Sequence, residues 1–170
     1  MALETILTRL IPELRAYATS LAADRTAAED IVQDALERAL KSPNRPEQIN
    51  DLRPWMFRTI RNLHYDELRK LRVRREYAER EGRFSTEGNT IQDPAQDVLV
   101  RMAFERLAPE KKEVLFLVDV MGLKYAEAAE IIGIAIGTVM SRVSRARQAL
   151  LMVVDDSSVT PVKRSGTIRK

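Results

Sequence analysis

The sequence predicts an all-α protein made of two small helical domains joined by a flexible linker. Apolar residues recur at spacings of three and four along most of the 170 residues, which is typical of helices with one buried face. No alternation of strand and helix patterns is present. Periodicity is lost at 79–96, where Gly, Ser, Asn and Pro collect. We therefore predict domains at 1–78 and 97–153, a linker at 79–96 and a disordered tail at 154–170.

Composition narrows the possible functions. The chain has no cysteine and a single histidine, His64, so disulfides, thiolate metal sites and His-based zinc sites or catalytic triads are not expected. Ser141 and Ser144 have no histidine near them in the sequence, and no Gly-rich phosphate loop occurs. These observations predict a protein that is not an enzyme and needs no metal or cofactor. The absence of a signal-peptide pattern and of a long apolar run predicts a cytoplasmic protein without membrane insertion.

The first domain is expected to begin with two helices. Leu3–Leu21 has helical spacing, and Pro12 is expected to bend or restart that helix. Thr26 and Glu29 have the spacing of a capping box for a second helix, whose apolar face runs to Leu40. The opposite face carries a polar stripe composed of Asp30, Gln33, Asp34 and Glu37. Such a stripe is either a solvated helix face or a docking surface for a basic partner.

A third helix combines aromatic rings and cations on its exposed side. It follows a loop with two prolines, and Asp51 is expected to cap it before it runs from Leu52 to about Leu71. Residues 52–80 hold nine basic and four acidic side chains. The exposed stripe consists of Trp55, Arg58, Asn62, Tyr65, Arg69 and Arg72. Rings can stack on unpaired bases while guanidinium groups hold phosphates; alternatively, Trp55 anchors the core and the arginines only solubilise the helix.

The second domain is expected to contain a helix-turn-helix. A helix from about Asp97 to Leu107 and a central helix beginning at Pro109 precede the motif. Tyr125–Ile132 has the pattern of its first helix, and Gly133 can supply the left-handed conformation that ends a helix. Gly137 is expected to open the second helix.

The second helix of this motif has one apolar and one basic face. The apolar stripe is Val139, Val143, Ala146 and Leu150. The opposite face holds Ser141, Ser144, Arg145 and Gln148, flanked by Arg142 and Arg147. Short polar and basic side chains suit the major groove of DNA, although two ordinary bundle helices would also fit the pattern. Lys124 and Tyr125, where the first helix begins, are expected to hold a phosphate.

Three segments taken together resemble a known family. DIVQDALERAL (30–40), LRPWMFRTIRNLHYDELRK (52–70) and residues 107–151 look like regions 2 and 4 of an extracytoplasmic-function sigma factor of bacterial RNA polymerase. The resemblance spans about residues 5–151. It implies a sigma factor that binds the β and β′ subunits of core RNA polymerase, recognises the minus-10 and minus-35 promoter elements and promotes initiation. It also implies an anti-sigma factor as a partner.

The resemblance assigns a role to each stripe. Residues implied to dock on core polymerase are Asp30, Gln33, Asp34 and Glu37. Residues implied to bind the minus-10 element are Trp55, Arg58, Arg61, Asn62, Tyr65 and Arg69. Residues implied to bind the minus-35 element are Lys124, Tyr125, Thr138, Ser141, Arg142, Ser144 and Arg145. The loop at 42–50 is implied to capture an unstacked base.

Two positions depart from the family pattern. Met140 stands where several members carry Arg or Lys, and Ala135 replaces a proline common in the turn. The minus-35 sequence therefore cannot be carried over from the family. Two other functions remain open at this stage: a sigma-like decoy or adaptor that sequesters an anti-sigma factor, and a stand-alone helix-turn-helix repressor.

Overall fold

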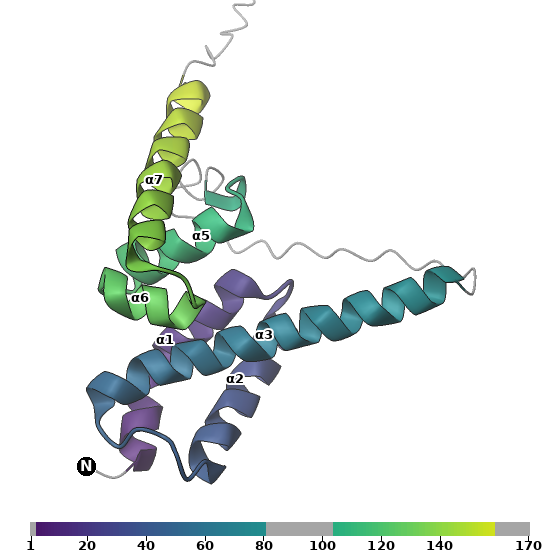
Figure 1. Ribbon diagram of the computed structural model, residues 1–170, viewed down its shortest axis with the longest axis vertical. Helices are drawn as coiled ribbons and strands as arrows, with labels where there is room; N and C mark the ends of the chain where they lie inside the picture. Colours follow the sequence, from purple (N-terminus) through teal and green to yellow (C-terminus); the bar gives the residue numbers. More distant parts are fainter. Residues whose placement is uncertain (1–2, 81–103, 159–170) are drawn as a thin grey trace, which may run out of the picture.

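The computed structural model describes residues 3–80 and 104–158, and every regular element in those ranges is helical. The elements are α1 (Leu3–Leu21), α2 (Arg25–Lys41), α3 (Ile49–Arg80), α5 (Pro109–Leu115), the π-helical segment η1 (Phe116–Val120), α6 (Tyr125–Ile132) and α7 (Ile136–Ser158). The first three form one bundle, and the others form a second unit (Figure 1). The predicted all-α class is confirmed.

The first bundle is built by α1, α2 and α3, each of which packs against the other two. Its core contains side chains that are fully shielded from solvent, among them Leu14, Tyr17, Leu52, Phe57 and Ile60. α1 continues through Pro12 without a restart.

Local details of this bundle correct three expectations. Asp24, not Thr26, caps α2: its carboxylate accepts a hydrogen bond from the Ala27 N–H at 2.8 Å, and the ionised side chain also suits the positive end of the helix. Glu29 instead pairs with Arg15 at 3.0 Å. α3 begins at Ile49, so that Asp51 lies in its first turn rather than at the cap. Leu40, expected in the core, is 54% exposed at the end of α2.

α3 is a 32-residue helix whose second half projects from the bundle (Figure 1). It runs past the predicted end at Leu71 and reaches Arg80, two residues into the predicted linker. Leu68 and Leu71 continue the apolar spacing of this helix, but they are 45% and 48% exposed because the core ends before them. The rest of the predicted linker, and most of the helix predicted from Asp97, lie outside the described residues.

The second unit contains the helix-turn-helix. α6 has the predicted bounds, and Gly133 ends it at a φ of 80°. α7 begins at Ile136, one residue before the predicted start, since the N–H groups of Thr138 and Val139 donate to the Ala135 carbonyl at 2.9 and 3.1 Å. Pro109 opens α5 as predicted.

The apolar face of α7 is largely as expected. Val139, Val143 and Ala146 are buried, whereas Leu150 is half-buried. α7 continues to Ser158, five residues into the segment predicted to be disordered. The remainder of that tail lies outside the described residues.

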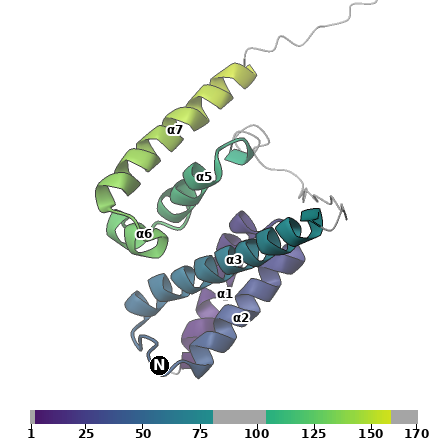
Figure 2. The ribbon, with the colours of Figure 1, turned by 45° about the vertical axis from the view of Figure 1, so that its right-hand side comes forward.

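The two units pack against each other in this structure. α3 lies against α6 (Figures 1 and 2). α1 contacts η1. Within the described segments, no helix combines the length and apolar character needed to span a membrane. The face of α3 that meets the second unit includes residues predicted to bind DNA.

Candidate nucleic-acid interface

The acidic face of α2 is exposed to solvent. Asp30, Gln33, Asp34 and Glu37 all lie on the surface. Glu37 accepts a hydrogen bond from Lys41 one turn later, which lowers the pKa of its carboxyl group. The other three make no side-chain hydrogen bond or ion pair with any residue that the structure describes. Their polar groups are available to a partner.

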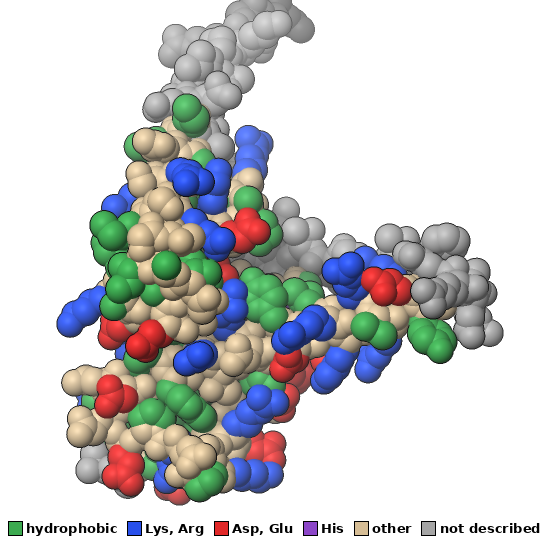
Figure 3. Space-filling view, in the orientation of Figure 1, with side chains coloured by type: hydrophobic (Ala, Val, Ile, Leu, Met, Phe, Trp, Pro, Cys, Tyr) green, Lys and Arg blue, Asp and Glu red, His purple; other side chains and the backbone are tan. Residues whose placement is uncertain are grey.

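The predicted minus-10 residues of α3 do not form one uniform surface. Arg58, Asn62 and Arg69 are exposed, and Arg69 pairs with Asp66 one turn earlier. Trp55 is half-buried, between the two predicted alternatives of a core anchor and an exposed ring. Lys and Arg side chains line the projecting half of α3, interspersed with acidic ones (Figure 3).

A groove of about 870 Å³ lies between the second half of α2 and the first half of α3. Its lining residues are Asp34, Glu37, Arg38, Lys41, Ser42, Trp55, Arg58, Thr59 and Asn62. The groove therefore brings residues predicted to bind polymerase beside residues predicted to bind the minus-10 element. Ser42, at the start of the predicted base-capturing loop, lies at the same groove.

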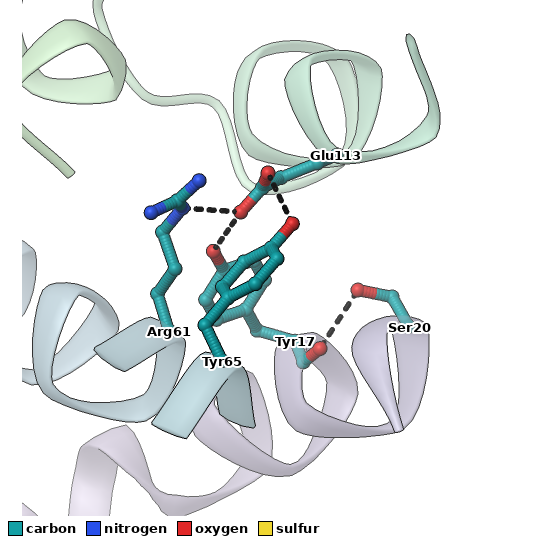
Figure 4. Close-up of polar contacts among 5 residues, drawn as sticks. All are labelled: Tyr17, Ser20, Arg61, Tyr65 and Glu113. Atoms are coloured by element: carbon teal, nitrogen blue, oxygen red, sulfur yellow. Dashed lines mark hydrogen bonds and ion pairs between the residues drawn. The ribbon is translucent and has the colours of Figure 1, made fainter. Parts of the chain in front are cut away.

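Arg61 and Tyr65, the other two predicted minus-10 residues, turn toward the second unit. Both donate to the carboxylate of Glu113 on α5, Arg61 through Nε at 2.8 Å and Tyr65 through its hydroxyl at 3.4 Å (Figure 4). The hydroxyl of Tyr17 on α1 donates to the same carboxylate at 3.0 Å. We call these four side chains the Glu113 cluster. It joins three helices across the boundary between the two units.

Glu113 is buried, with 4% of its surface exposed. A buried carboxylate is tolerated when it is paired and hydrogen-bonded, and the cluster supplies one cation and two hydroxyl groups. Burial, together with the nearby Glu113 charge, raises the pKa of Tyr17 well above its usual value and raises that of Tyr65. Both phenols are therefore held in the protonated form that donates to Glu113.

Further contacts support the same boundary. Arg53 donates to the Met121 carbonyl at 2.7 Å and pairs with Glu13 at 2.7 Å. The ring of Tyr17 stacks on Phe116 of η1, with centroids 6.1 Å apart, and meets Phe57 edge to face at 5.0 Å. Polar and apolar contacts thus both hold the two units together.

The predicted minus-35 face of α7 is open to solvent by comparison. Thr138, Ser144 and Arg145 are exposed, while Ser141 and Arg142 are half-buried. The Ser141 hydroxyl donates to the Thr138 carbonyl at 3.0 Å. None of the five contacts the first bundle through a side-chain hydrogen bond or ion pair within the described residues.

The N-terminus of α6 differs from the expected phosphate site in one respect. Lys124 is exposed and Tyr125 half-buried, but the carboxylate of Glu127 accepts a hydrogen bond from the Lys124 N–H at 2.7 Å. One of the backbone donors expected to face a phosphate is thus already satisfied.

Comparison with known proteins identifies both units. The Sigma-70 region 2 family matches residues 6–74, and the Sigma-70 region 4 family matches residues 97–150. The chain is 37% identical to the ECF RNA polymerase sigma factor EcfG of Rhodopseudomonas palustris, over 85% of this chain and 82% of that protein. The chain belongs to the extracytoplasmic-function family of sigma factors. It therefore binds core RNA polymerase, recognises the minus-10 and minus-35 elements of promoters and promotes transcription initiation.

Other proteins similar to this chain are also sigma factors. The ECF sigma factor SigL of Mycobacterium tuberculosis is 32% identical over 85% of this chain and 84% of its own length. The sigma factor RpoE of Bartonella quintana, solved in complex with the anti-sigma factor NepR, is 35% identical with a TM-score of 0.71 and covers 89% of this chain and 96% of that chain. The first bundle is region 2, and the second unit is region 4.

Sequence reasoning did not find the centre of the cluster. Glu113 was not singled out, Tyr17 was expected only as scaffold, and Arg53 only as part of the basic segment. One local signal existed, because Glu113 precedes Phe116 and Leu117 by three and four residues and so lies on their buried face.

Proposed function

We propose that the exposed acidic stripe of α2, made by Asp30, Gln33, Asp34 and Glu37, is the surface of this sigma factor that docks on core polymerase. Its exposure supports the proposal, as do the carboxylates of Asp30 and Asp34, which pair with no residue that the structure describes. Region 2 would bind the minus-10 element along α3, and region 4 would bind the minus-35 element through Lys124, Tyr125 and the open face of α7. The protein acts in the cytoplasm, where it positions polymerase and DNA and performs no chemistry itself.

The Glu113 cluster makes the described arrangement a closed form. Arg61 and Tyr65 cannot donate to Glu113 and bind the minus-10 element with the same groups at the same time. Full engagement of the promoter therefore requires region 4 to leave region 2. Polymerase and promoter bind the open form better than the closed form, and that difference in affinity is what shifts the equilibrium.

The chemistry of the cluster suits a reversible contact. A buried ion pair contributes little net stability, because the cost of removing both charges from water offsets their attraction. Once the units separate, Arg61 and Glu113 both regain water. The cluster therefore selects one closed geometry without making that geometry difficult to leave.

An anti-sigma factor is the partner that we propose for the closed form. The related RpoE of Bartonella quintana was solved in complex with the anti-sigma factor NepR. A protein that touches both regions at once would stabilise the contact between α3 and α6 and keep Arg61 and Tyr65 away from DNA.

Run-off transcription tests the proposed roles. Purified core bacterial RNA polymerase, a library of upstream regions and this chain as the only added factor should give discrete transcripts. Absence of any new transcript would refute the role in initiation. The same reaction would reveal the promoter sequence.

Charge reversal tests the docking surface. Asp34→Lys would place a cation opposite the basic surface expected on core polymerase. It should therefore weaken binding to core polymerase by about tenfold or more, or ~1.4 kcal/mol. Glu4→Lys makes the same charge change at an exposed position of α1 and serves as the control. Equal affinities of the two variants for polymerase would show that the stripe is only a solvated helix face.

A further inference from the structure

Two apolar side chains lie exposed on the first turns of α7. Ile136 is 48% exposed and Met140 is 53% exposed. They are four residues apart, so they lie one above the other on the same side of the helix. Both lie at the edge of the stripe that contains Val139 and Val143, but they are exposed whereas those two valines are buried. They adjoin the polar face that carries Ser144.

The side of α7 that carries Ile136 and Met140 is electrically neutral. Arg147 follows Met140 by seven residues and continues its stripe. The guanidinium of Arg147 donates hydrogen bonds to both carboxylate oxygens of Asp119, at 2.6 and 3.0 Å, and this raises the pKa of Arg147. The charge of Arg147 is thus neutralised by a neighbour in region 4.

The other side of α7 is cationic. Arg142 and Arg145 lie there, and neither makes an ion pair with any residue in the described segments. α7 therefore presents a neutral apolar edge on one side of its polar face and a cationic edge on the other. A helix lying in the major groove with these two edges would meet different chemical groups on each side.

We infer that Ile136 and Met140 determine specificity by contacting thymine methyl groups of the minus-35 element. The inference rests on the proposed placement of α7 in the major groove. Thymine is distinguished there by its C5-methyl group, which apolar side chains contact, whereas Arg or Lys selects the O6 and N7 acceptors of guanine. The unbranched thioether of Met140 can adapt its shape to such a methyl group.

The test removes single methyl groups from DNA. The holoenzyme of the full chain and core polymerase first selects its preferred element from promoters randomised at minus-35. Each thymine of that element, on either strand, is then replaced singly by deoxyuridine, which lacks only the methyl group. At one or two positions, the substitution should weaken binding of the holoenzyme about fourfold, the effect of one buried carbon group.

Variants of the chain connect each methyl group to a side chain. Met140→Ala should weaken binding to the thymine element by a similar factor and should remove the effect of deoxyuridine at one position. Ile136→Ala should do the same at its own position. Met140→Leu keeps an apolar contact and should retain the deoxyuridine effect.

Val120→Ala is the matched control. Val120 is 57% exposed in region 4 but lies on η1, outside the predicted DNA face. This variant should keep every deoxyuridine effect at its wild-type size.

The outcomes separate this inference from the proposed function. A selected element without A·T pairs, no effect of deoxyuridine on the wild type, or an undiminished effect in both alanine variants would overturn the inference while leaving the sigma role intact. Failure of the chain to start transcription on any promoter would instead refute the proposed function on which it rests.

Discussion

The two predicted DNA surfaces of this sigma factor differ in how they are presented. On α7 of region 4, Thr138, Ser144 and Arg145 point into solvent. On α3 of region 2, Arg61 and Tyr65 are bound to Glu113 of the other region. The minus-35 surface is thus formed and open in the closed chain, whereas part of the minus-10 surface becomes available only after the regions separate.

This difference has a simple physical origin. Arg145 is exposed and makes no ion pair within the described residues, so binding DNA costs it only desolvation and side-chain entropy. Arg61 must also leave its buried partner Glu113. The interaction lost between them is offset only when Glu113 regains water. We therefore expect closure to weaken contacts with the minus-10 element more than contacts with the minus-35 element.

Removing Glu113 should abolish the difference between the two surfaces, and this is the largest effect that we expect. In the closed form, Glu113→Ala would leave the buried Tyr17 hydroxyl and Arg61 without their partner, at a cost of about 3–5 kcal/mol. The chain can avoid that cost by opening. We therefore expect a larger hydrodynamic radius and tighter binding of the free chain to single-stranded minus-10 DNA.

Glu110→Ala is the control for this experiment. Glu110 lies one turn before Glu113 on α5 and is exposed. It should change neither the radius nor the affinity for single-stranded DNA. If Glu113→Ala and Glu110→Ala behave alike while both keep their helical circular dichroism, the Glu113 cluster does not close the molecule. Glu113→Gln, which keeps an acceptor without the charge, should give an intermediate opening.

Two arginines of α7 differ in the same way within region 4. Arg145→Ala should weaken minus-35 binding by about 1–3 kcal/mol if the side chain holds a base edge. Arg147 is bound to Asp119, so Arg147→Ala should lower stability slightly, by at most about 1 kcal/mol for a surface pair, with less effect on DNA affinity. Competition binding and urea unfolding of both variants measure the two quantities. Equal losses of DNA affinity would contradict the assignment.

The titration of Tyr65 reports the closed form directly. Burial and the Glu113 charge raise the pKa of Tyr65 when the regions are closed, whereas an open chain should titrate near the usual value of about 10. Because the closed-state pKa is the higher one, closure keeps its full contribution from Tyr65 below pH about 10 and loses it as the pH rises further.

Tyrosinate absorbance tests this prediction. Subtracting the titration of Tyr65→Phe from that of the wild type isolates the signal of Tyr65. The midpoint should be higher in the wild-type chain than in a Glu113→Ala background. Identical midpoints in the two backgrounds would mean that Tyr65 does not sense Glu113.

Much of the fold could be predicted because its determinants are local. The bounds of α6, the left-handed Gly133 and Pro109 at the start of α5 follow from side-chain and backbone chemistry within a few residues. The errors arose where local signals competed. Both Asp24 and Thr26 can cap a helix, and the ionised Asp24 did so. Leu40 and Leu71 have helical spacing, but where a core ends depends on the neighbouring helices.

The Glu113 cluster could not be predicted in the same way. Tyr17 and Glu113 are 96 residues apart, and they meet only because region 4 packs on region 2. The segment around Glu113, PEKKEVLF, has three other charged residues nearby, so a glutamate there looks solvated. Arg61 and Tyr65 were predicted to bind the minus-10 element, but a sequence pattern cannot reveal which partner such residues meet in the free chain.

An effect much smaller than that of Glu113 concerns how rigidly region 4 presents its open surface. Gly133 has a φ of 80°, and a Cβ added there would meet no atom within 4 Å. Gly133→Ala should therefore destabilise region 4 by about 1–2 kcal/mol through backbone strain alone. A Cβ added at Gly137 would likewise meet no atom within 4 Å, but Gly137 lies in α7 and has no positive φ. Gly137→Ala should therefore stabilise region 4 by about 0.5–1 kcal/mol. Urea unfolding of the two variants measures this difference in sign. If both alanines destabilised region 4 equally, the turn would not depend on a left-handed residue, and the fixed angle between α6 and α7 would need another cause.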